Sequence, residues 1–378
     1  MTFTEVEAIA FSALEGADAA LADEVVEKYA DLHDFFTQEG AGFKNLGEAM
    51  AMAREEVEFT GKHHVQPISI FDEDKYPRRL RNCPDAPLML YKLGSADLNP
   101  ARSMSVVGTR KLTPYGAHYS ARLVEEVKGV CPAGVTVLSG LAYGVDRVAH
   151  EAALKWGMPT IGVLAHGLSM IYPATHRGLA TAILNAGGAL VTEYRHGEKP
   201  FRGNFLARNR LVAGMSDVVV VTESPVKGGA MNTARHAYGY GRGVAAVPGR
   251  IGDEASGGCN QLIAKGVARL VSSGKEIAEI AEWELGEAEG QHFRGSTPEN
   301  GGQGRQPSLF SDGKEATIQY EGATLQVYEC LKGSGEPMRQ DEIAARTGLP
   351  IREVISAVGD LDFDGILLRY PGSKVGLA

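Results

Sequence analysis

The amino-acid sequence predicts an α/β protein whose central domain is a doubly wound, mostly parallel β-sheet with helices on both faces. Between residues 104 and 271, short apolar runs alternate with helical stretches, the order that parallel sheets require. The apolar runs are continuous rather than alternating with polar residues, as in strands that are buried on both faces. We expect a small helical domain before this region. Three helical stretches and a hairpin pattern after it predict a winged helix.

In the central domain, continuous apolar runs predict the strands, and stretches with apolar residues at helical spacing predict the helices. Strands are expected at 104–107, 135–140, 159–167, 189–194, 217–224, 244–249 and 268–271. Helices are expected between them, including 115–128, 145–156, 176–186 and 229–241. Because ligands bind outside the carboxyl ends of the strands in such a sheet, the strand ends are where a site is expected.

The flanking regions suggest four segments. Residues 1–65 have apolar residues at helical spacing and form an acidic, SAM-like helical domain. Residues 66–275 hold the central domain, whose lead-in at 71–94 is expected to be extended because it is rich in proline. Residues 276–317 are rich in Gly, Ser, Pro and Gln and are expected to be a flexible linker. Residues 318–378 form the winged helix.

Composition excludes several classes of protein. Hydrophobic residues make up 44% and charged residues 22% of the 378, the balance of an ordinary globular chain. The four cysteines are far apart, without a CxxC pair, which disfavours zinc sites and disulfide frameworks. No apolar run approaches the roughly 18 residues of a membrane span, and the acidic N-terminus does not resemble a signal peptide. We therefore expect a cytoplasmic protein without a metal or a membrane partner.

Charge is unevenly distributed along the chain. Between Ser105 and Lys275 there are 19 basic and 10 acidic side chains. The whole chain has 38 basic and 47 acidic side chains, so the remaining residues have 19 basic and 37 acidic ones. The first 60 residues alone hold 3 basic and 14 acidic side chains. Such segregation favours an anion-binding central domain, although a solvated basic surface is the simpler alternative. The winged helix, with 6 basic and 9 acidic side chains from Ile318 onward, is expected to contact protein or to regulate rather than to bind duplex DNA.

The strand ends suggest phosphate binding. The first strand runs into Gly108, Thr109 and Arg110, and Gly228 and Gly229 precede a helix whose free amides and dipole favour an anion. Neither a GxGxxG loop after the first strand nor a GxxxxGK[ST] loop is present, so the usual dinucleotide and ATP sites are disfavoured and no cofactor is expected. A guanidinium at the strand end suits a single, separate phosphate.

Six motifs, in order, resemble one known family: "SVVGTRKLTPYG", "VLSGLAYGVDRVAHEAAL", "TIGVLAHGLSMIYPATHRGL", "LVTEYRHGEKPFRGNFLARNRLVAGMSDVVVVTES", "GGAMNTARHAYGYGRGVAAVPG" and "GCNQLIAKG". The chain is similar to the DNA processing protein A family, also called DprA or Smf, strongly over about residues 70–272. The resemblance implies a Rossmann-like core in a cytoplasmic, non-catalytic homodimer. It implies a protein that binds single-stranded DNA and loads a RecA-type recombinase onto it during natural transformation. Its phosphate motif corresponds to Gly108, Thr109 and Arg110, and its RNR element to 208–210.

The residues expected to bind DNA combine both arguments. They are Gly108, Thr109, Arg110, Lys111, Ser139, Gly140, Tyr172, Arg177, Arg208, Asn209, Arg210, Lys227, Gly228 and Gly229. Each has a structural alternative. Arg110 could pair with an acid such as Glu193 or Asp217, Arg208 and Arg210 could brace the sheet edge, and Tyr172 could pack rather than stack on a base.

The same region also offers residues that could serve an enzyme. His150 and His166, with Glu193 or Glu223, could be acid–base partners, but His150 lies in a helix and is expected to be a core residue. A nucleotide-processing enzyme of the phosphoribohydrolase kind would need an acid in the loop "KGGAMNTARHA", where this chain has arginine and histidine. A nucleotide-sensing module in phage defence remains a third reading. No Ser-His-Asp order or metal-ligand spacing supports catalysis, so no catalytic residue is expected.

Overall fold

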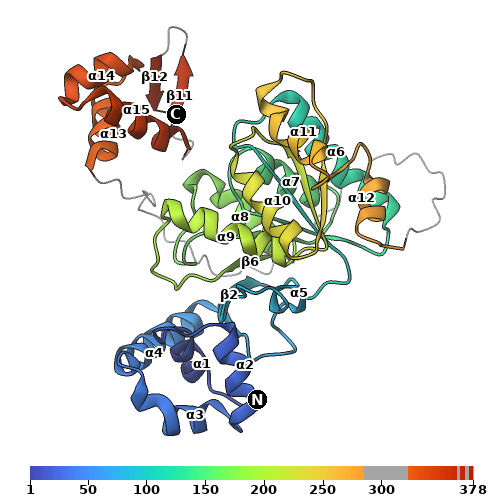
Figure 1. Cartoon of the computed structure of the whole chain (residues 1–378), viewed down its shortest axis with the longest axis vertical. Coiled ribbons are helices and arrows are strands. Elements are labelled where there is room, and N and C mark those ends of the chain that lie inside the picture. The colour runs from blue at the N-terminus through green and yellow to red at the C-terminus, as the bar shows by residue number, and fades with distance from the viewer. Residues whose placement is uncertain (285–321, 364–366, 371–373, 378) are drawn as a thin grey trace. The chain divides into compact units, whose positions relative to one another are not determined.

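The computed structural model describes residues 1–284, 322–363, 367–370 and 374–377 (Figure 1). The chain divides into two compact units between residues 316 and 317. In the described part of the chain, no helix is both long enough and apolar enough to span a membrane.

The first unit is built on a nine-stranded sheet in the order β1-β2-β6-β5-β4-β3-β7-β8-β9. The strands from β3 onward pair in parallel, whereas β1 and β2 are antiparallel to their neighbours. The chain moves outward from β3 to β6 and then returns to place β7 beside β3, so the strand order reverses between β3 and β7. The strands are β1 (Gln66–Ser69), β2 (Met89–Gly94), β3 (Ser103–Gly108), β4 (Thr136–Ser139), β5 (Thr160–Val163), β6 (Ala189–Thr192), β7 (Val218–Glu223), β8 (Gly243–Ala246) and β9 (Arg269–Leu270).

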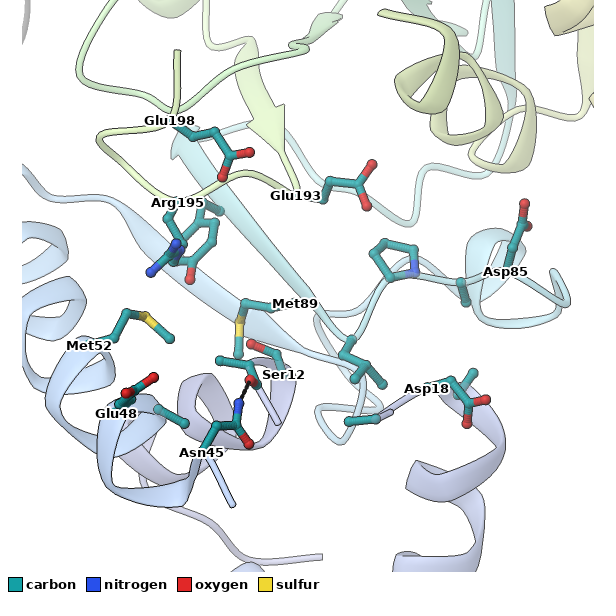
Figure 2. A pocket seen from close by; sticks show the side chains of 18 of the residues that line it. Ser12, Asp18, Asn45, Glu48, Met52, Asp85, Met89, Glu193, Arg195 and Glu198 are labelled. Carbon is teal, nitrogen blue, oxygen red and sulfur yellow. Dashed lines mark hydrogen bonds between the residues drawn. The ribbon is translucent and has the colours of Figure 1, made fainter. Parts of the chain in front are cut away.

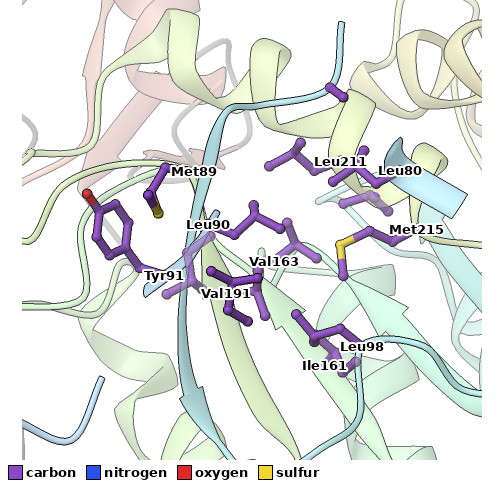
Figure 3. Packing of buried hydrophobic residues seen from close by; sticks show 14 of the residues in the cluster. Leu80, Met89, Leu90, Tyr91, Leu98, Ile161, Val163, Val191, Leu211 and Met215 are labelled. Carbon is purple, nitrogen blue, oxygen red and sulfur yellow. The ribbon is translucent and has the colours of Figure 1, made fainter. Parts of the chain in front are cut away.

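Helices cover both faces of the sheet, as the continuous apolar strands predicted. In β7, Val218 and Val220 join a core cluster with α6, α7 and α12, while Val219 and Val221 join a second cluster with α8, α9 and α10. Figure 3 shows the second cluster where β2, β5, β6 and α9 meet. The helices of this region are α5 (Arg78–Arg81), α6 (Pro114–Val130), α7 (Val145–Lys155), α8 (Arg177–Asn185), α9 (Arg202–Gly214), α10 (Gly229–Gly239), α11 (Gly257–Ala264) and α12 (Gly274–Ile280).

The predicted doubly wound fold is confirmed, and two features differ from expectation at its edges. The lead-in, expected to be extended throughout, is extended in β2 but contains the short helix α5. Strand β2 pairs antiparallel with β6 about a hundred residues later, a partner that local sequence does not reveal. The ordered region also extends past the expected boundary at 275. Ser273 and Glu276 form a capping box that starts α12, Ile277 is buried, and Trp283 donates to Asp217 at 3.3 Å. The linker was expected at 276–317, and its part from 285 to 317 lies outside the described residues.

Four helices precede the sheet and share its core. They are α1 (Glu5–Ser12), α2 (Ala19–Lys28), α3 (Leu32–Glu39) and α4 (Leu46–His63). The Phe11 and Phe71 rings meet edge to face at 5.1 Å, which joins α1 to the lead-in. Glu56 on α4 is buried and accepts from the His196 backbone N–H at 2.9 Å and from its Nδ1 at 2.6 Å. The helical domain is therefore bonded to the loop that follows β6.

Replacing Glu56 with alanine should lower the free energy of unfolding by about 1–3 kcal/mol, because a buried backbone N–H and an imidazole lose their acceptor. Urea unfolding measures the change. Glu58→Ala, on the same helix but exposed, is the matched control and should leave stability within about 0.5 kcal/mol. Equal losses in the two variants would contradict the role of Glu56.

The second unit is a winged helix, as predicted. It consists of α13 (Gly322–Ser334), β10 (Met338–Arg339), α14 (Gln340–Thr347), α15 (Ile351–Phe363), β11 (Leu367–Tyr370) and β12 (Lys374–Leu377). Its small core includes Val327, Leu331, Ile343, Val354 and Leu361. The strands form a three-stranded antiparallel sheet in the order β10-β12-β11.

Candidate nucleic-acid interface

The loop after β3 is fixed at the point where the strand order reverses. The Thr109 backbone N–H donates to the Glu223 carbonyl at 2.7 Å, and the Thr109 carbonyl accepts from Val145 N–H at 3.2 Å. A Cβ atom on Gly108 would lie 2.3 Å from Val145 Cγ2, so only glycine fits there. This loop is therefore held between the end of β7 and the start of α7, and Arg110 follows at a position where doubly wound proteins bind ligands.

Glu223 is occupied in holding the next turn of chain. Its carboxylate is buried and accepts from Thr113 N–H at 2.9 Å and from Thr113 Oγ1 at 2.5 Å. Thr113 in turn caps α6, whose first residue is Pro114. A Cβ atom on Gly116 would lie 2.5 Å from Glu223 Oε2. Glu223 thus positions the segment that carries Arg110 rather than facing an open site.

The loop after β4 packs directly on the loop after β3. Gly144 has a φ of 76°, and a Cβ atom there would lie 2.1 Å from the Thr109 carbonyl oxygen. Asp146, two residues later, accepts from Gly140 N–H at 3.0 Å and from Ala142 N–H at 3.3 Å. In "SGLAYGVD", Gly144 is therefore required by the close approach of the two loops, whereas a Cβ atom on Gly140 would lie 2.4 Å from Arg208 Nη2.

Arg208 lies in the interior. It is 4% exposed, and its Nη1 donates to the Gly140 carbonyl at 2.7 Å and to the Val163 carbonyl. Burial lowers the pKa of Arg208 to about 10, and Asp146 counteracts this. Burial likewise raises the pKa of Asp146, against the charge of Arg208. Arg208 therefore braces the ends of β4 and β5 from the interior, which is a structural role.

Two other expected contact residues are also turned inward. Ser139 is fully buried and its Oγ donates to the Val106 carbonyl at 2.7 Å. Arg210 forms an ion pair with Glu193, whose pKa is raised by burial and lowered in part by Arg210. Asp217 accepts from Arg79 Nε at 2.5 Å. Glu193 and Asp217, the acids considered for Arg110, thus have arginine partners of their own.

Arg110 lies beside an aromatic pair. Its guanidinium carbon is 5.1 Å from the centroid of the Phe205 ring, within cation–π range. The Tyr172 ring meets Phe205 edge to face at 5.7 Å, and Tyr172 N–H donates to His166 Nε2 at 3.2 Å. The peptide bond between Tyr172 and Pro173 is cis. Tyr172 is half-buried and packs on Phe205. Phe205, an aromatic residue of α9 that the sequence analysis missed, lies next to Arg110, the residue expected to bind phosphate.

The remaining expected residues are distributed around this centre. Lys111 and Lys227 are exposed, Arg177 is half-buried at the start of α8, and Gly228 and Gly229 form the N-terminus of α10. Asn209 Nδ2 donates to the Gly229 carbonyl at 3.4 Å, which links α9 to α10. Arg202 is exposed at the start of α9. Arg202 and Phe205 are three residues apart in "RGNFLARNR", and this helical spacing of a cation and an aromatic residue was the sequence signal that could have identified both.

The histidines considered for acid–base chemistry belong to the core. Burial lowers the pKa of His150 to about 3 and that of His166 to about 4. His150 Nδ1 shares a hydrogen bond of 2.7 Å with Thr160 Oγ1. Both rings are thus neutral at pH 7. Among the described residues, no group of three or more His, Cys, Asp or Glu side chains could hold a metal ion.

A cavity of about 640 Å³ lies elsewhere, between α1, α2, α4, β2 and the loop after β6 (Figure 2). Its charged lining residues are mostly acids, with one arginine: Asp18, Glu48, Asp85, Glu193, Arg195 and Glu198. Phosphates would be repelled there. The surface around Arg110 is therefore the better candidate for an anion site than this cavity.

The chain is similar to several known proteins over most of its length. The family model described as DNA recombination-mediator protein A matches residues 67–282, and that of the DprA winged helix domain matches 314–373. Protein Smf of Escherichia coli (strain K12) is 34% identical over 316 residues, covering 83% of this chain and 78% of that protein.

Two solved structures are similar as well. DNA processing protein A (DprA) from Streptococcus pneumoniae has 31% sequence identity and a TM-score of 0.62, covering 75% of this chain and 99% of that one. DNA processing protein A from Helicobacter pylori, described for its single-stranded DNA binding mode, has 29% identity and a TM-score of 0.51, covering 58% and 97%. Since the first family model covers more than half of the chain, this protein belongs to the DNA recombination-mediator protein A family, known as DprA or Smf.

Proposed function

We propose that the protein binds single-stranded DNA on the surface around Arg110 and presents it to a RecA-type recombinase. The observation that carries the proposal is the Arg110 guanidinium held over Phe205 where the strand order reverses. A cation beside an aromatic ring suits a phosphate joined to a base, and the surrounding sequence has a net positive charge. The Helicobacter pylori relative, described for its single-stranded DNA binding mode, supports the same assignment.

Binding in this proposal uses phosphate contacts without reading sequence. Arg110 contacts one phosphate, Lys111, Arg177, Arg202 and Lys227 supply further positive charge, and the amides of Gly228 and Gly229 take another phosphate at the N-terminus of α10. Arg208, Ser139 and Gly140 hold the loops in place from the interior. Gly108 and Thr109 present Arg110.

The protein changes no covalent bond in this proposal. It acts as a cytoplasmic homodimer during natural transformation and loads the recombinase onto the strand. The competing function is a nucleotide-processing enzyme on a similar core, for which Glu223, at the end of β7, would be a candidate acid. Its buried contacts with Thr113 favour a structural role instead. Turnover of nucleoside monophosphates by pure protein would favour the enzyme.

One titration tests the proposal. Labelled single- and double-stranded oligonucleotides are titrated with the full chain by fluorescence anisotropy at two salt concentrations, with free nucleotides as competitors. We expect preference for the single strand and weaker binding at higher salt, because released counterions drive association. A protein that binds free nucleotides but neither oligonucleotide would contradict the proposal.

Removing residues 285–378 should leave single-stranded DNA affinity within about threefold, because the excess of positive charge lies between Ser105 and Lys275. The winged helix is net acidic from Ile318 onward. Anisotropy titrations of the truncated and full chains measure the effect. Loss of binding on truncation would show that the winged helix supplies the main contact.

A further inference from the structure

His166 lies in the loop that follows β5 and leads to Tyr172. It is 1% exposed, so its ring cannot contact a nucleic acid. Its Nε2 accepts from the Tyr172 backbone N–H at 3.2 Å, and its Nδ1 lies 2.9 Å from the Gly167 carbonyl oxygen. Because a backbone N–H can only donate, Nε2 carries no proton, and the neutral ring donates its Nδ1 proton to Gly167. One tautomer therefore satisfies both hydrogen bonds.

The surroundings of the His166 ring keep it in this form. Burial, together with the charge of Arg208, lowers the pKa of His166 to about 4, although the two backbone hydrogen bonds oppose the shift. The ring is therefore neutral at pH 7, and Nε2 remains an acceptor. Two other buried histidines differ, because Nε2 of His150 and Nε2 of His176 have no hydrogen-bond partner among the described residues. His166 is thus held through both of its ring nitrogens.

The start of this loop is fixed to the loop that follows β6. The Gly167 backbone N–H donates to the Glu198 carbonyl at 2.9 Å. A Cβ atom on Gly167 would lie 1.9 Å from the Arg195 carbonyl oxygen, so only glycine fits there. The hydrogen bond to His166 ties Tyr172, at the far end of the loop, back to this fixed start.

Tyr172 is connected to Arg110 by two ring contacts. The Tyr172 ring meets Phe205 edge to face at 5.7 Å, and the Arg110 guanidinium carbon lies 5.1 Å from the Phe205 centroid. Phe205 is 7% exposed, so its neighbours determine where its ring lies. In a closely packed region, a shift of Tyr172 would move the Phe205 ring and the guanidinium that lies over it.

We infer that His166 is a positioning residue of the DNA site, an inference that rests on the proposed function. Its Nε2 lone pair holds the Tyr172 backbone, and Tyr172 and Phe205 together hold the Arg110 guanidinium where it meets a phosphate.

The test replaces His166 with two residues that each keep one of its hydrogen bonds. A glutamine amide reaches the position of Nε2 and can accept from Tyr172 N–H, whereas an asparagine amide reaches only the position of Nδ1 and can donate to Gly167. In anisotropy titrations of the full chain with labelled oligothymidine, His166→Asn should weaken binding roughly 3- to 10-fold, the range that one net hydrogen bond allows. His166→Gln should bind as wild type does. Both variants lose the imidazole ring, so each controls for lost packing in the other.

A double-mutant cycle shows whether His166 acts through Arg110. If it does, His166→Asn should cause no further loss of affinity in an Arg110→Ala background, because the contact that it disturbs is already absent. An undiminished loss in that background, or equal losses in His166→Asn and His166→Gln, would overturn the inference and leave the proposed function intact. If wild type shows no affinity for single-stranded DNA, both are overturned.

The tautomer of His166 can be measured in the wild-type chain, whatever the stability of the variants. Long-range proton–nitrogen NMR of protein with labelled histidine distinguishes a ring protonated at Nδ1 from one protonated at Nε2. We expect the His166 proton on Nδ1, both with and without oligothymidine. A proton on Nε2 would leave Tyr172 N–H without its acceptor and would refute the positioning role.

Discussion

Replacing Arg110 with alanine is expected to weaken binding of single-stranded DNA by about 1–3 kcal/mol, roughly 5- to 150-fold in Kd, across all sequences. A contact with a phosphate carries no base information, so no sequence should be spared. The slope of log Kd against log salt should fall by about 0.7, the counterion released per phosphate on a single strand. Arg110 is half-buried and its guanidinium lies over Phe205, so any fall in the melting temperature should be small and should not account for the loss of affinity.

A control is available on another helix. Arg122 also lies over an aromatic ring, that of Tyr119 at 5.7 Å, but it is paired with Glu126 at 2.6 Å. Arg122→Ala should leave both affinity and salt slope as in wild type. If Arg110→Ala lowers the melting temperature and keeps the wild-type salt slope, Arg110 is a structural residue and the proposed phosphate contact is wrong.

The sequence predicts the central fold well because parallel strands leave a local signature. Val218–Val221 are buried on both faces of the sheet, so the strand is a continuous apolar run. Strand β2, which lies between β1 and β6, leaves no such signature, because its antiparallel pairing with β6 depends on residues about a hundred positions away. Helix α12 had a readable start in Ser273 and Glu276, which the composition of the following segment obscured.

The candidate site is less predictable, because a motif gives residue types but not the direction in which they point. In "RNR", Arg208 enters the interior and Arg210 pairs with Glu193, yet both are arginines in the middle of the same helix. Which of them turns inward depends on how α9 lies on the sheet, and that is set by tertiary packing. The same packing brings Phe205 to Arg110.

Charge segregation has a structural counterpart. The acidic side chains of the first helices and of the loop after β6 gather around the cavity in Figure 2. The helical domain is joined to the sheet through Glu56 and His196. An acidic surface on this side would repel a DNA strand and so favour its placement along the strand ends around Arg110.

Replacing Arg208 with methionine should produce the largest loss of stability, about 3–5 kcal/mol. The reason is that the buried Asp146 carboxylate would lose the positive charge that compensates for the cost of its burial. The Gly140 and Val163 carbonyls would also lose their donor. Arg202→Met, an exposed position on the same helix, is the matched control and should unfold as wild type does. Urea unfolding at several pH values measures the difference.

The loss in Arg208→Met should depend on pH with a defined sign. Burial already raises the pKa of Asp146, and removing Arg208 should raise it further. A carboxyl whose pKa is higher in the folded than in the unfolded state destabilises the fold when it is ionised. The deficit should therefore be largest above the folded-state pKa and should shrink as the pH falls toward the ordinary carboxyl range. A deficit that is equal at all pH values would mean that the lost carbonyl contacts, and not the charge of Asp146, account for the role of Arg208. Unchanged stability, with weakened DNA binding, would instead return Arg208 to the binding surface.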